Sequence, residues 1–291
     1  MASEHAGPVI AMLGHTTVIN CIPCGFAHQD PILSEDIMER YYRSHFWQSE
    51  KADALRILRR QRKWWQETYG DWLSLLGEPG FLLDFGSGYG DFILAALAWA
   101  CSPVTGIEPS HQASDHCESV GLHICRQDWQ DFARQNPNGR AGIVSALWLL
   151  EHLTNPASFL HYAHHILRPD GHLLLVVPNE WTPLQEEANL FANKKEWWIH
   201  SSHINYFSWA SITALLKTCS FEIVERFATY PMERFILAGR DYTDNPRVGR
   251  KAHREIERRD LSMSRSQRME YYRQLGATGR GRDIVLVAVK R

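Results

Sequence analysis

Residues 82–92 read LLDFGSGYGDF, in the order of an apolar strand, a glycine-rich turn and the first turn of a helix. Gly86, Gly88 and Gly90 allow the backbone to turn tightly and allow a ligand to lie directly against it. A dinucleotide-binding fingerprint would place its third glycine where this chain has Asp91. The stretch therefore predicts a strand–turn–helix unit whose ligand is not a dinucleotide.

Acidic residues lie at the ends of the first three apolar runs. Asp84 precedes Gly86 by two positions, where a negative charge suits a cationic ligand such as the amino group and sulfonium of S-adenosylmethionine. Glu108 ends the next run, and a carboxylate there can accept hydrogen bonds from both ribose hydroxyls. Asp128 could bind the adenine amino group while Trp129 covers the ring. The alternative for Glu108 and Asp128 is an ordinary solvent-exposed or loop carboxylate.

Short apolar runs alternate with amphipathic stretches from Phe81 onward, which is typical of a parallel sheet with helices on both faces. The predicted fold class is α/β, with a Rossmann-like doubly wound sheet. Seven strands are expected, over Phe81–Phe85, Pro103–Ile107, His123–Arg126, Gly142–Leu147, His172–Val177, Phe221–Phe227 and Ile284–Val289. Helices are expected over Asp91–Ala100, Ser110–Val120, Gln130–Gln135, Ala157–Leu167 and Ser208–Thr218.

The glycine-rich turn and the three acids resemble those of class I S-adenosylmethionine-dependent methyltransferases. Three further segments, ALWLLEHL (146–153), LRPDGH (167–172) and VPN (177–179), are similar to a subgroup with ubiquinone-biosynthesis O-methyltransferases and many sugar and natural-product methyltransferases. That subgroup usually has two glycines after the proline, whereas this chain has Asp170-Gly171. The resemblance implies a seven-stranded sheet whose last strand is antiparallel.

The same resemblance implies S-adenosylmethionine as the cofactor and a site for it. Asp84 and the glycines would hold the methionine end, Glu108 the ribose and Asp128 the adenine. The full set of expected cofactor contacts is Asp84, Gly86, Ser87, Gly88, Gly90, Glu108, Asp128, Trp129, Leu147 and Tyr41.

Methyl transfer to a hydroxyl needs a positioned acceptor and benefits from a base that is active near neutral pH, for which histidine is suited. His152 follows the fourth strand of the predicted sheet and His203 lies in a loop after the fifth. Both are candidate bases, with His203 preferred, and either could instead be structural. Trp64 and Trp65 are adjacent, so only one would face the acceptor. Substrate contacts are expected from Tyr42, Trp148, Tyr206 and Trp198.

Cys21 and Cys24, with His28 and His15 nearby, offer a Cys₂His₂ ligand set in a short segment rich in glycine and proline. Tetrahedral zinc accepts such ligands, and a segment with little core is stabilised by a metal. A complete zinc ribbon has a second cysteine pair, which this sequence lacks. Three interpretations stay open: a structural zinc ion, a remnant ribbon with free thiols, and a redox-active cysteine pair.

The chain is expected to divide into three parts. Residues 1–33 contain the Cys/His segment, 34–76 an aromatic-rich helical lid running from Ser34 to about Tyr69, and 77–291 the methyltransferase domain, with a helical insertion at about 240–280. From Arg247 onward there are thirteen Lys/Arg against five Asp/Glu. These basic residues form either a solvated helical face or an anion-contacting element beside the active site.

Bulk composition limits the classes of function that the chain can have. The 291 residues carry a formal net charge of −2 with no run of about 18 apolar residues, so neither charge-driven nucleic-acid binding nor a membrane span is expected. The first residues do not have a secretory pattern, which favours a cytoplasmic protein with reduced cysteines.

The sequence favours O-methylation of a small-molecule acceptor, a sugar or secondary metabolite, with a histidine base. Alternatives are C-methylation of a nucleotide sugar, methylation of nucleic acid or protein, and a nonenzymatic scaffold. Oligomeric state is not predicted.

Overall fold

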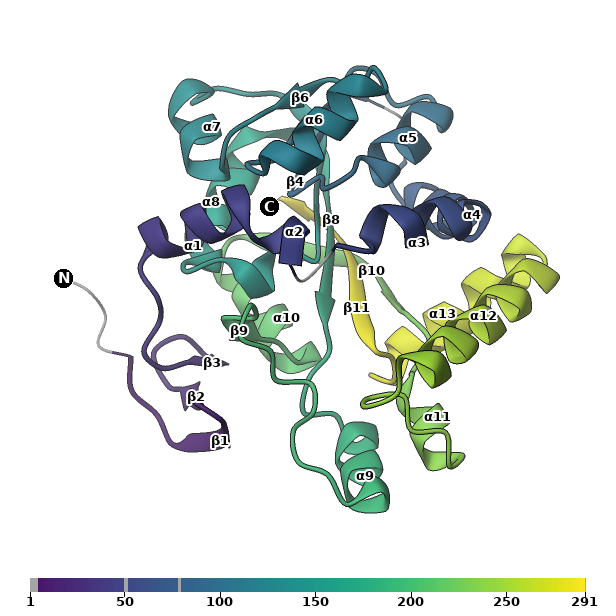
Figure 1. Ribbon diagram of the computed structural model, residues 1–291. Helices are drawn as coiled ribbons and strands as arrows, with labels where there is room; N and C mark the ends of the chain where they lie inside the picture. Colours follow the sequence, from purple (N-terminus) through teal and green to yellow (C-terminus); the bar gives the residue numbers. More distant parts are fainter. Residues whose placement is uncertain (1–4, 50–51, 78–79, 291) are drawn as a thin grey trace.

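The computed structural model describes residues 5–49, 52–77 and 80–290, and its centre is a seven-stranded sheet (Figure 1). The strand order is β10-β11-β8-β7-β4-β5-β6. Strands β6, β5, β4, β7 and β8 run parallel, whereas β11 pairs antiparallel with both β8 and β10. The strands are β4 (Leu82–Phe85), β5 (Val104–Ile107), β6 (Ile124–Cys125), β7 (Ala141–Leu147), β8 (Leu167–Pro178), β10 (Phe221–Ala228) and β11 (Asp283–Lys290).

This arrangement confirms the predicted doubly wound sheet and its antiparallel last strand. Strand β8 begins earlier than expected. Leu167 pairs with Ala141 and His172 pairs with Ile143, so the four residues between Leu167 and His172 form an irregularity inside the strand rather than a turn before it.

Helices cover both faces of the central sheet. Leu173 and Leu175 of β8 pack into one core with α7 (Trp129–Gln135), α8 (Pro156–Ile166) and α10 (Trp209–Thr218). Leu174 and Val176 pack into the opposite core with α4 (Arg62–Leu73), α5 (Asp91–Ala98) and α6 (His111–Ser119). Successive side chains of a strand point to opposite faces, and helices cover both faces of this sheet. Apolar side chains are therefore needed at consecutive positions of the strand.

The segment expected to be one long helical lid is divided into four helices. They are α1 (Glu35–Ser44), α2 (Phe46–Ser49), α3 (Ala54–Arg60) and α4. Ser34 is the N-cap residue of α1, and two acids occupy the first turn as expected. Gln61, with φ −102° and ψ 15°, separates α3 from α4. The breaks let α1 to α3 bend over the carboxyl ends of the strands while α4 packs against the sheet (Figure 1).

Two further regions flank the sheet. A four-stranded antiparallel sheet is formed by β1 (Val9–Leu13), β2 (Thr16–Cys21), β3 (Phe26–Gln29) and β9 (Asn205–Tyr206). The pairing of β9 with β3 was not expected, and it joins the first expected part of the chain to the third. The expected insertion contains α12 (Pro246–Ser262) and α13 (Arg265–Ala277), after the short α11 (Glu233–Leu237).

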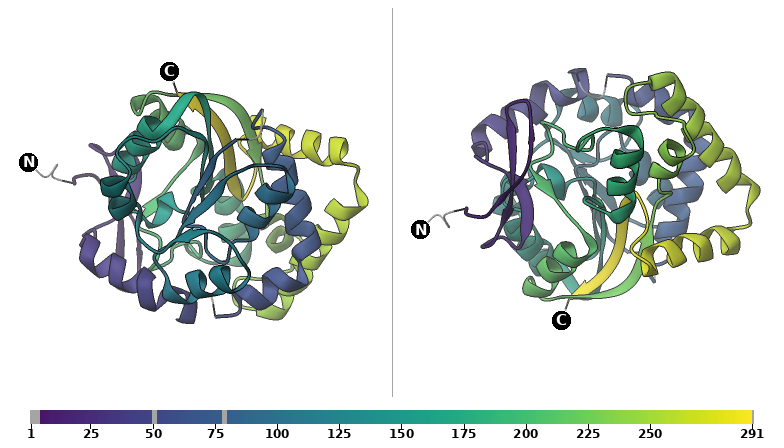
Figure 2. Two further views of the ribbon diagram at one scale, coloured as in Figure 1. Left: turned by 90° about the horizontal axis from the view of Figure 1, so that it is seen from above. Right: turned by 90° about the horizontal axis from the view of Figure 1, so that it is seen from below.

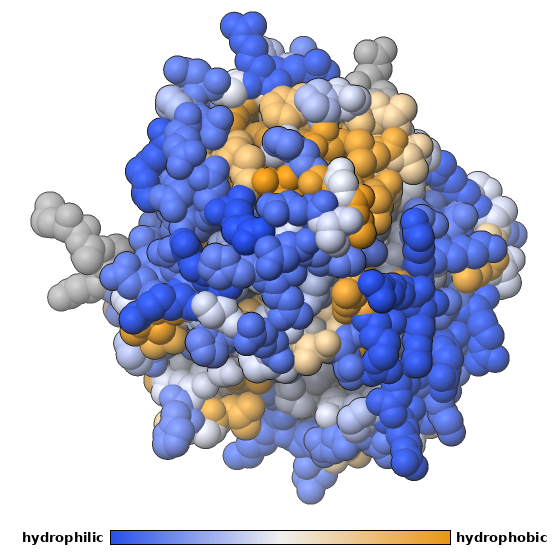
Figure 3. Space-filling view, turned by 45° about the horizontal axis from the view of Figure 1, so that its top comes forward, coloured by the Kyte–Doolittle hydropathy of each residue, from blue (hydrophilic) through white to orange (hydrophobic). Residues whose placement is uncertain are grey.

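The small sheet and the insertion lie on opposite sides of the central sheet (Figure 2). Arg268 of α13 and Asp71 of α4 are both buried, and their side chains form an ion pair with an Nε–Oδ2 distance of 2.5 Å. Most of the face shown in Figure 3 is hydrophilic, and its largest group of apolar residues lies in the upper half. Among the described residues, no helix combines the length and apolar character that crossing a membrane requires.

Candidate active site

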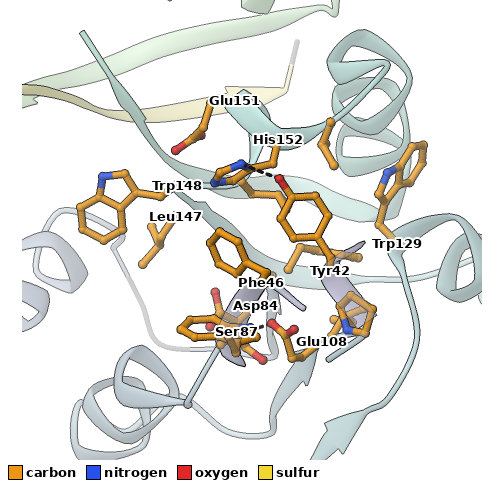
Figure 4. Close-up of a pocket in the computed structure, with 18 of the residues that line it drawn as sticks. Tyr42, Phe46, Asp84, Ser87, Glu108, Trp129, Leu147, Trp148, Glu151 and His152 are labelled. Carbon is orange, nitrogen blue, oxygen red and sulfur yellow. Dashed lines mark hydrogen bonds between the residues drawn. The ribbon is translucent and has the colours of Figure 1, made fainter. Parts of the chain in front are cut away.

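A cavity of about 900 Å³ opens at the carboxyl ends of β4, β5 and β7, the edge at which open α/β sheets bind ligands. The β4–α5 turn, the ends of β5 and β7, and the start of α7 line it on the sheet side. Helices α1 to α4 line the opposite side. Figure 4 shows Tyr42 of the lid bonded to His152, with Phe46 between His152 and the acids Asp84 and Glu108.

The glycine-rich turn has the conformation that its sequence predicts. Gly86, Gly88 and Gly90 have φ values of 70°, 53° and 79°, which favour glycine. Gly86 and Gly88 line the cavity, whereas Gly90 is the N-cap residue of α5 and packs beneath it against Leu122. Gly90 thus shapes the turn and does not line the cavity.

Asp84 is buried at the end of β4 and accepts a hydrogen bond of 2.7 Å from the Ser145 hydroxyl on β7. Burial, together with the nearby Glu108, raises the pKa of Asp84 to about 7, although the Ser145 bond opposes this. The carboxyl group therefore takes up a proton near neutral pH, unless a cationic group approaches and stabilises its charge.

Glu108 is buried at the end of β5, and both of its carboxylate oxygens accept backbone hydrogen bonds. Oε2 accepts from Gly88 N at 2.8 Å and Oε1 from Ser110 N at 3.0 Å. The Trp47 side chain of α2 lies beside this carboxylate. Burial raises the pKa of Glu108, and the two backbone bonds and the nearby Trp47 side chain oppose the rise. The lid thus contacts the acid that was expected to hold a ribose.

The other expected cofactor contacts fall into two groups. Ser87, Asp128, Trp129 and Leu147 line the cavity. Asp128 is also the N-cap of α7, because its Oδ1 accepts a 2.7 Å hydrogen bond from Asp131 N. Tyr41 does not line the cavity, whereas the next residue, Tyr42, does. Neighbouring residues on a helix point in different directions, and the sequence alone did not define which tyrosine of α1 faces inward.

Both candidate bases line the cavity, with ring centroids 5.0 Å apart. His152 Nδ1 lies 2.8 Å from the Ser202 carbonyl oxygen and 2.7 Å from the Tyr42 hydroxyl (Figure 4). A carbonyl oxygen only accepts hydrogen bonds, so this contact favours a proton on Nδ1 and a lone pair on Nε2. Glu151, His152 and His203 also have ligand atoms within 4.8 Å of one another, an arrangement that could hold a cation.

Aromatic side chains form the wall nearest to α4. The rings of Trp65 and Tyr69 stack at 5.2 Å, and Trp148 lies edge-on to Trp65 at 5.9 Å. Trp148 has a φ of 52°, rare for a bulky residue, and its indole nitrogen donates to Asp283 at 3.1 Å. Trp64 faces away and donates to Asp260 of α12 at 2.9 Å, so Trp65 is the member of the pair that faces the cavity.

Two buried polar atoms at the cavity have no hydrogen-bond partner among the described residues. They are the Ser87 hydroxyl and the Trp65 indole nitrogen. Buried polar groups are usually paired, so such atoms at a cavity wall favour a ligand that pairs with them.

Two expected substrate contacts, Tyr206 and Trp198, are not at the cavity. Both are almost fully buried in the core that the small sheet forms with the loop just before β9. Tyr206 belongs to β9, and its hydroxyl donates to the His200 carbonyl. Their placement depends on the pairing of β9 with β3, which the local sequence does not indicate.

The structure also adds residues that were not expected at the site. Trp47 lies beside Glu108, and Asp91, whose pKa burial raises to about 6, lines the cavity beside the glycine-rich turn. Asp91 follows Gly90 directly, so its position in the turn was the available signal. Of the basic residues after Arg247, Arg282 alone lines the cavity in the described part of the chain, and Glu180 pairs with it at 3.0 Å.

The Cys/His segment differs from expectation in one ligand candidate. Cys21, Cys24 and His28 come together as expected, but the fourth member of the group is His5. His15 lies in the exposed turn between β1 and β2. Strand β2 separates the two places by six residues, about 20 Å of extended chain, so His15 is too far away to join the group.

Comparison with known sequences supports one family over most of the central domain. The family described as "Methyltransferase domain" matches residues 58–226. The ubiquinone biosynthesis O-methyltransferases of Serratia proteamaculans and Actinobacillus pleuropneumoniae are 29% and 34% identical to this chain over 107 residues. These matches cover 35% and 34% of this chain and 44% and 45% of the relatives. The chain thus spans less than half the length of these relatives.

Solved structures show the same fold at low sequence identity. A methyltransferase dependent on S-adenosylmethionine from Archaeoglobus fulgidus is 13% identical, with a TM-score of 0.55 over 79% of this chain and 94% of that one. The 1,6-didemethyltoxoflavin-N1-methyltransferase of Burkholderia thailandensis, solved with its substrate and S-adenosylhomocysteine, is 13% identical. Its TM-score is 0.53, over 98% of this chain and 99% of that one.

Proposed function

Because the chain belongs to the methyltransferase-domain family, we propose that it transfers the methyl group of S-adenosylmethionine to a hydroxyl group of a small molecule. The observation that carries this proposal is the pair of buried acids, Asp84 and Glu108, on neighbouring strands beside the glycine-rich turn. A buried carboxylate is costly unless it is paired. A ligand with a cationic amino group, a sulfonium and ribose hydroxyls would pair with both.

The remaining residues of this side fit the same ligand. In the proposed complex, Asp84 attracts the cationic methionine end and Glu108 accepts from the ribose. The unpaired Ser87 hydroxyl supplies a further polar contact beside the turn. Asp128 uses one oxygen to cap α7, and the other can accept from the adenine amino group beside the Trp129 ring.

For the acceptor, the aromatic wall of Trp65, Tyr69 and Trp148 favours a flat secondary metabolite over a sugar. Stacked and edge-on rings bind planar groups well. The unpaired indole N–H of Trp65 can donate to an oxygen of that acceptor. The curated relatives, named as O-methyltransferases of ubiquinone biosynthesis, support transfer to oxygen.

The proposed chemistry is an in-line displacement at the methyl carbon. The acceptor oxygen forms the new bond to carbon, the carbon–sulfur bond breaks, and S-adenosylhomocysteine is the second product. We propose that Nε2 of His152 takes the proton from the acceptor hydroxyl, because the Ser202 carbonyl orients the ring through its bond to Nδ1. The lid helices would exclude water from the transfer.

The first test is calorimetric titration of the protein with S-adenosylhomocysteine. We expect binding in the micromolar range that Asp84→Ala and Glu108→Ala each weaken by about 1–3 kcal/mol, the scale of hydrogen bonds to charged groups. Glu187→Ala is the matched control, because Glu187 is exposed on α9 (Pro183–Ala192), away from the cavity. Absence of binding by the native chain would overturn the proposal and favour a nonenzymatic scaffold.

A further inference from the structure

Side chains of His5, Cys21, Cys24 and His28 form a compact group near the β2–β3 turn of the small sheet. Their ligand atoms all lie within 4.8 Å of one another. His5 Nδ1 is 3.8 Å from Cys21 Sγ and 3.4 Å from Cys24 Sγ. Around tetrahedral zinc, with bonds of about 2.3 Å to sulfur and 2.0–2.1 Å to nitrogen, these atoms would be about 3.6 Å apart. The four side chains thus already have the spacing of a metal site.

His28 provides an independent sign of a ligand. Its side chain is fully buried, and its Nδ1 donates to the Gln29 carbonyl at 2.7 Å. That bond leaves the lone pair on Nε2, and Nε2 is a buried atom with no hydrogen-bond partner in the described ranges. A backbone carbonyl bonded to one ring nitrogen is the usual way in which proteins orient a metal-binding histidine.

Backbone contacts hold the other members of the group in place. In the turn between β2 and β3, Gly25 N donates to the Cys21 carbonyl at 3.0 Å, and this turn brings Cys24 beside Cys21. Ile22 N donates to the Ala6 carbonyl at 2.8 Å. The chain before β1 therefore runs beside the end of β2, and this path delivers His5 to the two cysteines.

We propose that His5, Cys21, Cys24 and His28 bind one zinc ion. Two thiolates and two imidazoles in a tetrahedral arrangement favour zinc over metals that prefer oxygen ligands or square-planar geometry. Four protein ligands leave no open position for a reacting molecule, so the ion is structural. It cross-links the chain before β1, the β2–β3 turn and β3, all within a sheet of four short strands.

The zinc site also braces the loop that carries His203. Gln29, the residue after His28, donates from its backbone to the Ile204 carbonyl at 2.8 Å. Its side-chain amide donates to the His203 carbonyl at 2.7 Å. Gln29 therefore joins His28, a ligand of the ion, to His203, a residue of the cavity wall. Bound zinc should make the loop that carries His203 more rigid.

The proposal is tested by metal analysis of the full chain and by zinc competition against a chromophoric chelator. We expect about one zinc per native chain, and zinc binding weakened at least 10–100-fold in His5→Ala, since loss of supporting contacts alone typically costs that much. Cobalt substitution should give thiolate-to-metal absorption that Cys24→Ser reduces. His15→Ala is the matched control. If His15 instead of His5 were the fourth ligand, His15→Ala would weaken zinc binding and His5→Ala would not.

Each outcome bears on the proposal. Zinc in the native chain and in His15→Ala, with weakened binding in His5→Ala, supports the four-residue site. A native chain that binds no zinc overturns it, as does equal zinc affinity of His5→Ala and the native chain. Thermal unfolding of each variant, with and without zinc, distinguishes ligand loss from misfolding, because a folded variant that has lost the ion no longer gains stability from added zinc.

Discussion

At the residue scale, the identity of the base depends on which of two neighbouring histidines is oriented for proton transfer. His152 has Nδ1 on the Ser202 carbonyl, and its ring is 5.0 Å from that of His203. We predict that His152→Gln lowers kcat by about 10²- to 10⁴-fold, the usual contribution of a general base. Formation of S-adenosylhomocysteine with a panel of phenols and catechols is the measurement.

The matched variant is His203→Gln, because it changes the same side chain at the same wall. We expect it to lower kcat much less, and neither variant should alter the affinity for S-adenosylhomocysteine. A larger loss of kcat in His203→Gln than in His152→Gln would show that the base is His203, as the sequence alone suggested. The ranking of the two variants therefore decides the assignment.

Residues next to a recognisable turn were predictable, and residues placed by long-range pairing were not. Asp84 and Glu108 come to the cavity because each ends a strand of a sheet whose order follows from the alternation of strands and helices. Tyr206 lies away from the cavity because its strand pairs with β3, about 180 residues earlier in the chain. His15 lies away from the cysteines for a different, local reason: it occupies the turn between β1 and β2, at the far end of β2 from Cys21.

At the scale of elements, the lid contacts the very group that the cofactor is proposed to use. Trp47 of α2 lies beside Glu108 and against the turn, where a Cβ on Gly88 would be 2.9 Å from the Trp47 ring. A ribose bound by Glu108 would therefore compete with Trp47 for the carboxylate.

We predict that Trp47→Phe tightens binding of S-adenosylhomocysteine by about 2–10-fold, because the indole N–H that would compete with the ribose for Glu108 is removed, and an ordinary hydrogen bond contributes about 0.5–1.5 kcal/mol. Calorimetric titration measures the change. Trp209→Phe is the control, because Trp209 is outside the cavity and its indole nitrogen has no partner in the described chain. Weaker binding in Trp47→Phe would instead show that the indole belongs to the bound site.

Local signals account for which elements were found. Ser34 and the acids after it located the start of the lid, but the turns that divide 34–69 into four helices depend on how the lid wraps the cavity. Helix α9 was missed although its capping box, Thr182 with Gln185, and Pro183 at the first position are readable signals. Strand β9 has two residues and no local signal at all.

At the scale of the whole molecule, the fold buries several carboxyl groups fully or partly. Burial raises the pKa of Asp84 to about 7 and that of Asp91 to about 6, and it also raises the pKa of Glu108 and Glu233. In the unfolded chain such groups titrate near pH 4. Between about pH 4 and 7 the native protein therefore holds protons that the unfolded chain has released.

This difference fixes the sign of the pH dependence of stability. Because the native state binds more protons, the contribution of Asp84 is fully present below about pH 4 and is lost as pH rises toward 7.

We predict that the native chain loses up to about 1.4 kcal/mol of unfolding free energy per pH unit relative to Asp84→Asn across this window. Urea denaturation at pH 5, 6 and 7 measures it, with Glu187→Gln as the control that should follow the native chain. Saturating S-adenosylhomocysteine should remove this trend, because its cationic amino group keeps Asp84 ionised, so that its binding tightens as pH rises. Parallel curves for the native chain and Asp84→Asn would mean that Asp84 is already ionised in the ligand-free fold.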